Sequence, residues 1–351
     1  MTRPFIPLSS DTETRPTEAM RRAIAAAEVG DEQRAEDPSV LRIQERVAEL
    51  TGKEAALFMP TGTMCNVIAV KTHTHAADAV IAEHMSHVIR AETGGMGLVS
   101  GLMIEPIVTE RGIFTPDEID DAIRRLSSAP FPYAPVARLL CVEQTHNFGG
   151  GSVWTKGELA AVYARAKERS LAVHMDGARL MNAVVASGAK ASEFGASTDS
   201  LWIDFTKGLG APMGAALAGS KAFIAEARRY KHMFGGAMRQ AGVIAAGCLH
   251  ALDHHVERLA EDHDNARRLA EGLGAIRGIR LATPTPESNI IFFDVSGLGT
   301  DNRSFVANAT ELGVRFSPVG SSVRAVTHLD VSRDDIETAI QIVERMAKAG
   351  S

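Results

Sequence analysis

Cysteine is scarce in this 351-residue chain, which contains only Cys65, Cys141 and Cys248. These residues are odd in number, far apart and surrounded by apolar neighbours, so they predict buried, reduced thiols. A disulfide framework and a cysteine metal site are both excluded by that spacing. Reduced thiols are typical of a cytoplasmic protein, and we expect this location for the chain.

The sequence also lacks long apolar runs and any excess of basic residues. No run is long enough to span a bilayer, and residues 1–6 lack the apolar core of a signal peptide. The 37 Lys and Arg are outnumbered by 43 Asp and Glu, which gives a formal net charge of -6. Neither a membrane nor a nucleic acid is therefore an expected partner.

Short apolar runs alternate with capped helical segments over the first two thirds of the chain. Capping boxes at Thr115–Glu118 and Thr155–Glu158 mark two helix starts. The pattern predicts an α/β fold with a mostly parallel, doubly wound sheet, whose turns after the strands open on one edge. The predicted strands are 54–59, 79–83, 103–108, 138–143, 173–176, 200–206 and 214–219.

The last third of the chain predicts a smaller α+β domain. A helical region from about 241 to 272 leads into it, followed by a strand at 289–295, a helix near 304–312, strands near Val314 and Val323, and a final helix after Ser332. We therefore expect an N-terminal arm (1–15), a large domain (16–245) and a small C-terminal domain (246–351).

One lysine stands out at the predicted sheet edge. Lys207 follows the apolar run at 200–206 within a segment rich in glycine and proline, where partial desolvation can make its amine a nucleophile toward a carbonyl. The preceding strand ends in Asp176. An acid that can pair with a pyridinium nitrogen, followed by a Schiff-base lysine, is what a pyridoxal 5'-phosphate site requires.

Two turns at the same edge have more than one interpretation. The turn at Gly62 and Thr63 either presents backbone N–H groups to a phosphate or is only the tight connection that any strand and helix need. His87 either stacks on a flat cofactor ring or caps a surface turn. His84 and His87 could share a metal, but no third ligand follows at a matching spacing, so no metal site is predicted.

Three further polar residues are candidates for the site. His146 and Asn147 follow a predicted strand and either line the site or cap the turn. Arg324 lies inside an apolar strand, where a buried guanidinium is costly unless a carboxylate matches it. That carboxylate belongs either to the protein or to a bound substrate.

Over nearly its whole length, the chain resembles the L-threonine aldolase group of fold-type-I pyridoxal-phosphate enzymes, in the beta-eliminating lyase superfamily. The segments that carry the resemblance occur in the family's order. They are residues 10–16, 36–39, 60–66, 86–87, 92–95, 143–147, 174–179, 206–212, 235–240 and 324–330.

The resemblance implies roles for the residues around Lys207. Lys207 would form the Schiff base, and Asp176 would keep the pyridinium nitrogen protonated. His87 would stack on the ring with Glu92 close by, and Arg179 would face both the phenolic oxygen of the cofactor and the substrate carboxylate.

The resemblance also implies a phosphate site and a substrate site. The phosphate would lie at Gly62 and Thr63, with Thr206 a weaker candidate, and Arg239 would reach a phosphate in its own or a neighbouring subunit. Ser10 and Arg324 would hold the substrate carboxylate. The implied assembly is a homo-oligomer, a dimer or tetramer with shared sites.

The implied reaction is retro-aldol cleavage of an L-β-hydroxy-α-amino acid, of the L-threonine or L-allo-threonine type, to glycine and an aldehyde. His87, Glu92 and an ordered water are alternative bases for the β-hydroxyl proton. The alternative chemistry on the same scaffold is β-elimination or dehydration of a 3-substituted amino acid. A non-catalytic carrier is disfavoured because every catalytic position is filled.

The chain departs from the family pattern at two places. Arg34 and Ala35 stand where relatives commonly have Tyr-Gly, and Tyr133 is the nearest substitute for a histidine that often faces the substrate. We expect Arg34 and Tyr133 to lie at the side-chain end of the substrate. An added cation at Arg34 would favour a substrate with a second acidic group.

Overall fold

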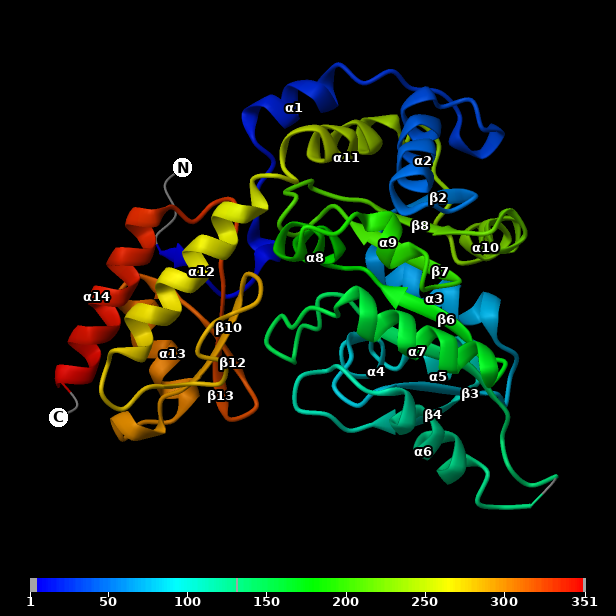
Figure 1. Ribbon diagram of the computed structural model, residues 1–351. Helices are drawn as coiled ribbons and strands as arrows, with labels where there is room; N and C mark the ends of the chain where they lie inside the picture. The colour runs from blue at the N-terminus through cyan, green and yellow to red at the C-terminus, as the bar shows by residue number, and fades with distance from the viewer. Residues whose placement is uncertain (1–4, 131, 350–351) are drawn as a thin grey trace.

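A seven-stranded sheet forms the centre of the larger part of the molecule (Figure 1). The computed structural model describes residues 5–130 and 132–349. Strand β8 runs antiparallel to both of its neighbours, and the other neighbouring strands are parallel. The order is β2 (Ala55–Met59), β8 (Ala215–Gly219), β7 (Ser200–Asp204), β6 (Ala172–Asp176), β5 (Ala137–Glu143), β3 (Ala79–Glu83) and β4 (Met103–Ile107).

Helices cover both faces of this sheet, which explains why most of its strands are continuously apolar. Successive residues of β2 point to opposite faces. Phe58 packs in the core that includes residues of α2 (Pro38–Thr51) and α7 (Lys156–Glu168), whereas Leu57 and Met59 pack against α3 (Gly62–His73) and α10 (Lys221–Met233). The three cysteines are buried and free, as predicted.

The C-terminal part forms a second lobe, drawn from yellow to red in Figure 1. Its antiparallel sheet has the order β12 (Ser317–Val319), β13 (Ser322–Val326), β10 (Ile290–Asp294) and β9 (Arg280–Leu281). The helices of this lobe are α12 (Leu259–Gly274), α13 (Asn302–Glu311) and α14 (Arg333–Ala349). The N-terminal strand β1 (Ile6–Pro7) pairs in parallel with β11 (Val314–Arg315), and Leu8 lies in the core of this lobe.

The remaining elements are short or peripheral. Both predicted capping boxes are present at the starts of α6 and α7. The other elements are α1 (Glu18–Ala25), α4 (His87–Arg90), α5 (Gly95–Ser100), α6 (Pro116–Leu126), α8 (Leu180–Ser187), α9 (Ala191–Gly195) and the 3-10 helices Asp11–Glu13, Glu32–Arg34 and Ser296–Leu298.

The helical region predicted over 241–272 is two helices. Helix α11 (Gly242–His254) ends before α12 begins at Leu259. At the break, His255 Nδ1 donates a hydrogen bond to the carbonyl oxygen of Leu209 at 2.7 Å, so the turn is tied to the loop that carries Lys207. A periodic apolar pattern continues across this break, which is why the sequence did not reveal it.

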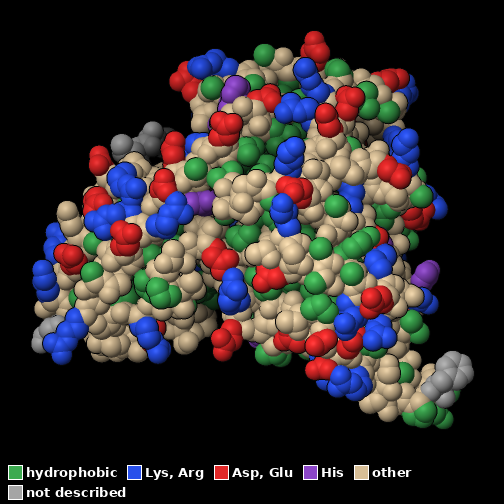
Figure 2. Space-filling model, in the orientation of Figure 1, with side chains coloured by type: hydrophobic (Ala, Val, Ile, Leu, Met, Phe, Trp, Pro, Cys, Tyr) green, Lys and Arg blue, Asp and Glu red, His purple; other side chains and the backbone are tan. Residues whose placement is uncertain are grey.

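The fold agrees with the predicted α/β class and places the ends of β3, β5, β6 and β7 at one edge of the sheet. On the face seen in Figure 2, acidic and basic side chains are interspersed rather than gathered by sign. Within residues 5–130 and 132–349, no helix combines the length and apolar character needed to cross a membrane.

Candidate active site

Lys207 and Asp176 come from neighbouring strands at this sheet edge. Asp176 is the last residue of β6 and is almost completely buried. Lys207 follows β7, and its Nζ lies 5.8 Å from the centre of the Trp202 ring. Two of the central predicted residues therefore lie at the ends of two adjacent central strands.

Asn66, in α3, fixes the carboxylate of Asp176. The Asn66 Nδ2 group donates hydrogen bonds to Asp176 at 2.8 Å and to Glu92 at 2.6 Å. Its Oδ1 atom accepts from Trp202 Nε1 at 2.7 Å and lies 3.1 Å from His174 Nε2. A fully satisfied buried amide of this kind locks the side chains around it. Asn66 therefore orients both carboxylates.

The environment of Asp176 favours its neutral form. Burial raises the pKa of Asp176 to about 6, and the negative charge of Glu143 adds to the effect. The charges of His87 and Lys207 oppose this shift. A cationic group placed against Asp176 would therefore be strongly favoured, because it would relieve the burial of the negative charge.

His87 and Glu92 form a hydrogen-bonded pair. His87 Nδ1 lies 3.0 Å from Glu92 Oε1, and the backbone N–H of His87 donates to Glu143 at 2.7 Å. Burial alone would lower the pKa of His87, but its hydrogen bond to Glu92 and the charge of Asp176 outweigh burial and raise the pKa.

These residues also form the one cluster in the described part of the chain with metal-ligand spacing. Ligand atoms of His87, Glu92 and Asp176 lie within 4.8 Å of one another. His84, the partner considered from the sequence, instead binds Glu83 through Nδ1 at 2.5 Å. Asn66 donates to both carboxylates of the cluster but does not neutralise their charge. An aromatic ring with a cationic nitrogen would therefore also suit this place.

Arg179 is paired with Asp11, which was not among the predicted site residues. Two parallel hydrogen bonds join them, Nε to Oδ2 at 2.8 Å and Nη2 to Oδ1 at 2.7 Å. Burial opposes the charge on Asp11, yet the charge and hydrogen bonds of Arg179 hold its pKa well below the usual value. Two donor groups of Arg179 are thus engaged within the chain.

Arg324 is half-buried and has no matching acid among the described residues. Its Nη1 donates to Asn147 Oδ1 and its Nη2 to the carbonyl oxygen of Ser9, both at 3.0 Å. Among the described residues, no carboxylate lies within 4.0 Å of Arg324, and its Nε is buried without a partner. Burial and the charge of Arg179 lower its pKa to about 10, so it remains a cation at neutral pH.

Gly62 begins α3 at the place predicted for a phosphate. A Cβ atom on Gly62 would lie 2.2 Å from the ring of Trp202, so only glycine fits here. Thr61 caps the helix by accepting from the N–H of Met64. The first N–H groups of any α-helix, here those of Gly62 and Thr63, have no acceptor within the helix and can donate to a bound anion.

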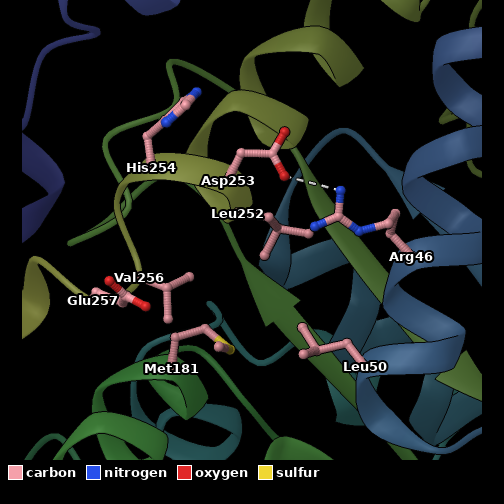
Figure 3. Close-up of a pocket in the computed structure, with 8 residues that line it drawn as sticks. All are labelled: Arg46, Leu50, Met181, Leu252, Asp253, His254, Val256 and Glu257. Carbon is pink, nitrogen blue, oxygen red and sulfur yellow. Dashed lines mark hydrogen bonds and ion pairs between the residues drawn. The ribbon is translucent and has the colours of Figure 1, made fainter.

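A separate pocket lies between α2, α8 and α11 (Figure 3). Its lining includes Arg46, which donates to Asp253 at 2.9 Å. None of the predicted site residues lines this pocket. The chemistry is therefore expected at the edge of the large sheet.

The sequence model of the family described as beta-eliminating lyase matches residues 7–296. The chain belongs to this family. It is 38% identical over 335 residues to the low specificity L-threonine aldolase of Escherichia coli (strain K12), covering 95% of this chain and 96% of that protein. It is 36% identical over 344 residues to low-specificity L-threonine aldolase 1 of Arabidopsis thaliana, covering 97% of this chain and 96% of that protein.

The fold of the family is also found among solved structures. Threonine aldolase from Leishmania major superposes with a TM-score of 0.82 at 22% identity, covering 97% of this chain and 99% of that chain. The resemblance drawn from the sequence motifs and the predicted fold type are confirmed by these comparisons.

Within this family member, several predicted site residues lie outside the central group of a single chain. Arg34 and Tyr133 are exposed, and Arg34 is 3.9 Å from Asp31. Arg239 also pairs with Asp31, at 3.1 Å. Their roles toward substrate and phosphate remain predictions.

Two other predicted residues are engaged locally. The Ser10 hydroxyl oxygen accepts from the backbone N–H and the hydroxyl of Thr12, at 3.2 and 2.9 Å. The Thr206 hydroxyl donates to Asp204 at 2.7 Å. Their predicted contacts with substrate carboxylate and phosphate also remain untested.

Four residues of the central network received no role from the sequence. Asp11 and Asn66 lay inside recognised segments, but their partners are distant in the chain. Glu143 ends a predicted strand and binds the N–H groups of His87 and Asn147. Asp204 stands three positions before Lys207, and this short spacing could have indicated an ion pair between them.

We predict that Asp11→Asn lowers the free energy of unfolding by about 3–5 kcal/mol, because it leaves Arg179 buried without its counter-charge. The matched control is Asp253→Asn, whose pair with Arg46 has side chains 46% and 41% exposed and should cost under about 1 kcal/mol. Urea unfolding at neutral pH measures both changes. Equal decreases in the free energy of unfolding of the two variants would contradict the importance assigned to the buried pair of Asp11 and Arg179.

Proposed function

We propose that this protein is a pyridoxal-phosphate-dependent aldehyde lyase. Its reaction would be cleavage of an L-β-hydroxy-α-amino acid, of the L-threonine or L-allo-threonine type, to glycine and an aldehyde. The observation that carries the proposal is Arg324, a half-buried cation whose Nε is buried without a partner and which has no carboxylate within 4.0 Å among the described residues. The charges of Arg179 and Asp11 both act on it. The names of the relatives in Escherichia coli and Arabidopsis support the same reaction.

The residues present fit pyridoxal 5'-phosphate. Lys207 offers an amine, and Asp176 offers a carboxylate whose charge is disfavoured until a cation lies against it. The start of α3 at Gly62 offers N–H groups beside the Trp202 ring, where no side chain fits. Glu92 Oε2 is buried and without a hydrogen-bond partner in the described part of the chain, so it can accept a hydrogen bond from a bound group.

When bound, the cofactor would supply a carbonyl carbon for an amine and a ring that draws electrons from the bond to be cleaved. Lys207 would hold that group covalently. Asp176, oriented by Asn66, would face the ring nitrogen and keep its proton in place. His87 would cover the ring face.

The His87–Glu92 pair is the proton-accepting group in this proposal. Because Glu92 accepts from His87 Nδ1–H, the neutral ring presents Nε2 as the atom that can take a proton from the β-hydroxyl of the substrate. The charges of Asp176 and Glu143 then stabilise the protonated ring, in agreement with the raised pKa of His87.

Arg324 would bind the substrate carboxylate. Its present partners are a side-chain amide oxygen and a backbone carbonyl oxygen, which orient the guanidinium without neutralising it. A carboxylate that reaches Nε would complete the hydrogen bonds of the group and restore charge balance. Fixing the carboxylate in this way would also fix which bond at Cα stands above the ring.

We also propose that the protein is a homo-oligomer, a dimer or tetramer, with sites completed by a neighbouring subunit. The exposure of Arg34, Tyr133 and Arg239 in a single chain supports this, since their predicted roles need a surface of another copy. The three free, buried cysteines support a cytoplasmic location.

Product analysis tests the reaction. We predict that the protein, loaded with pyridoxal 5'-phosphate and given L-threonine or L-allo-threonine, yields equal amounts of glycine and acetaldehyde, and that Lys207→Ala removes this turnover. Ammonia and a keto acid would instead indicate elimination. Full turnover by Lys207→Ala would contradict the proposed function altogether.

We further predict that affinity for pyridoxine 5'-phosphate falls as the pH drops below about 6. The pKa of Asp176 in the folded protein is raised to about 6, so below that pH the carboxyl is neutral and loses its attraction for the ring nitrogen cation. Asp176→Asn is the control, because the titrations of the ligand affect both proteins equally. The ratio of the two affinities should fall by roughly tenfold per pH unit below 6. A constant ratio between about pH 5 and 8 would contradict this role.

A further inference from the structure

Lys207 is paired with the acid that ends the strand before it. Asp204 is the last residue of β7, and its Oδ2 atom lies 3.0 Å from Lys207 Nζ. The side chains of Asp204 and Lys207 are 5% and 15% exposed, so the pair is largely shielded from water. Neither the catalytic scheme above nor the sequence motifs use Asp204.

The carboxylate of Asp204 is held in place by the turn that follows it. Its Oδ1 atom accepts hydrogen bonds from the backbone N–H of Thr206 at 2.9 Å and from the Thr206 hydroxyl at 2.7 Å. The backbone of Asp204 pairs with Ala215 of β8. Asp204 is therefore fixed, whereas Lys207 has a flexible stem of four carbons.

The pair and nucleophilic attack by Nζ require different protonation states of the same amine. In the pair, Nζ is an ammonium group that donates to a carboxylate. To attack a carbonyl carbon, the same nitrogen must lose a proton and expose its lone pair. Deprotonation therefore leaves the shielded charge of Asp204 without its counter-charge, which costs free energy, so the pair opposes the attack.

We propose that Asp204 is a positioning residue that captures the amine of Lys207 whenever this amine is not covalently bonded. In the exchange, the substrate amine would give up a proton and bond to the carbonyl carbon, the bond from that carbon to Lys207 Nζ would break, and Lys207 would take up the proton and pair with Asp204. Capture would delay the return of Lys207 to that carbon and so favour the bond to the substrate amine. This inference rests on the proposed function, because it assigns Asp204 a part in the same exchange of amines.

Competitive labelling of the protein without cofactor tests the capture directly. A limiting amount of acetic anhydride reacts with neutral amines, and mass spectrometry reports the rate at each lysine. In Asp204→Asn the amine of Lys207 is no longer held against a carboxylate at 3.0 Å, so we expect its labelling to rise by clearly more than the roughly twofold limit set for the control. The same labelling rate at Lys207 in a folded variant would overturn the proposal.

The matched control is Glu193→Gln. Glu193 pairs with Lys156 at 2.6 Å, but both side chains are about half exposed, so water screens the pair. Labelling of Lys156 should change less than twofold, and Lys207 should be unaffected. If Asp204→Asn does not fold, Thr206→Ala loosens the carboxylate by removing one of its hydrogen bonds and should raise labelling of Lys207. An unchanged rate there would also overturn the capture.

A second measurement uses the loaded enzyme. Because a free Lys207 competes better with the substrate amine, Asp204→Asn should raise KM for the amino acid by about tenfold while kcat changes less. A fall in kcat as large as the rise in KM would indicate that Asp204 has a structural role only. If the wild type cleaves threonine but labelling is unaltered in the variant, capture is wrong and the proposed function stands. If labelling rises but no β-hydroxy amino acid is cleaved, the pair is real and the proposed function fails.

Discussion

The ion pair between Asp11 and Arg179 joins the three parts of the chain on which the site depends. Asp11 belongs to the N-terminal arm, Arg179 follows strand β6 of the large sheet, and Asn289, which also donates to Asp11 at 3.2 Å, directly precedes β10 of the C-terminal lobe. The same arm places Thr14 against the carbonyl oxygen of Lys207 at 2.9 Å and Ser9 against Arg324. Substrate-binding and lysine-bearing segments are thus held in one frame by a buried pair of opposite charges.

Charge balance at the sheet edge explains the behaviour of the site. Three buried acids, Asp176, Glu92 and Glu143, lie near only a few cations, and Asn66 separates two of them with its amide. Burial raises the pKa of Asp176, and the charge of Glu143 adds to it. Burial would lower the pKa of His87, but its hydrogen bond to Glu92 and the charge of Asp176 raise it. A ligand with a cationic ring nitrogen would relieve the excess of negative charge on one side. On the other side, Arg324 is a cation with no carboxylate within 4.0 Å among the described residues, so it can bind an anion. The site therefore fits a zwitterionic substrate beside a pyridinium ring.

Much of the fold could be predicted from the sequence because its strands are short, apolar and separated by capped helices. Lys207 and Asp176 could be singled out because each follows such a strand. His87 and Arg324 were candidates from their places just after and within predicted strands, and the family motifs added Glu92 and the role of Arg179.

The contacts of these residues could not be predicted in the same way. Asp11 and Arg179 are 168 positions apart, and Asn66 and Asp176 are 110 apart, so no local pattern connects them. The sequence left open whether Arg324 faces a protein acid or a substrate acid. The structure places the Asn147 side chain and the Ser9 carbonyl oxygen against it, and the contact with a substrate carboxylate stays a prediction. The exposed Arg34 and Tyr133 show that a motif position does not by itself place a residue in the site of one chain.

The central claim is that the amine of Lys207 is the one that bonds covalently to pyridoxal 5'-phosphate. Reduction of the loaded protein with borohydride, followed by digestion and mass spectrometry, tests it most directly. The account predicts one reduced pyridoxyl phosphate group per chain, on the peptide that contains Lys207, and loss of the visible absorption band. An unmodified Lys207 peptide, or a label on another lysine, would contradict the account.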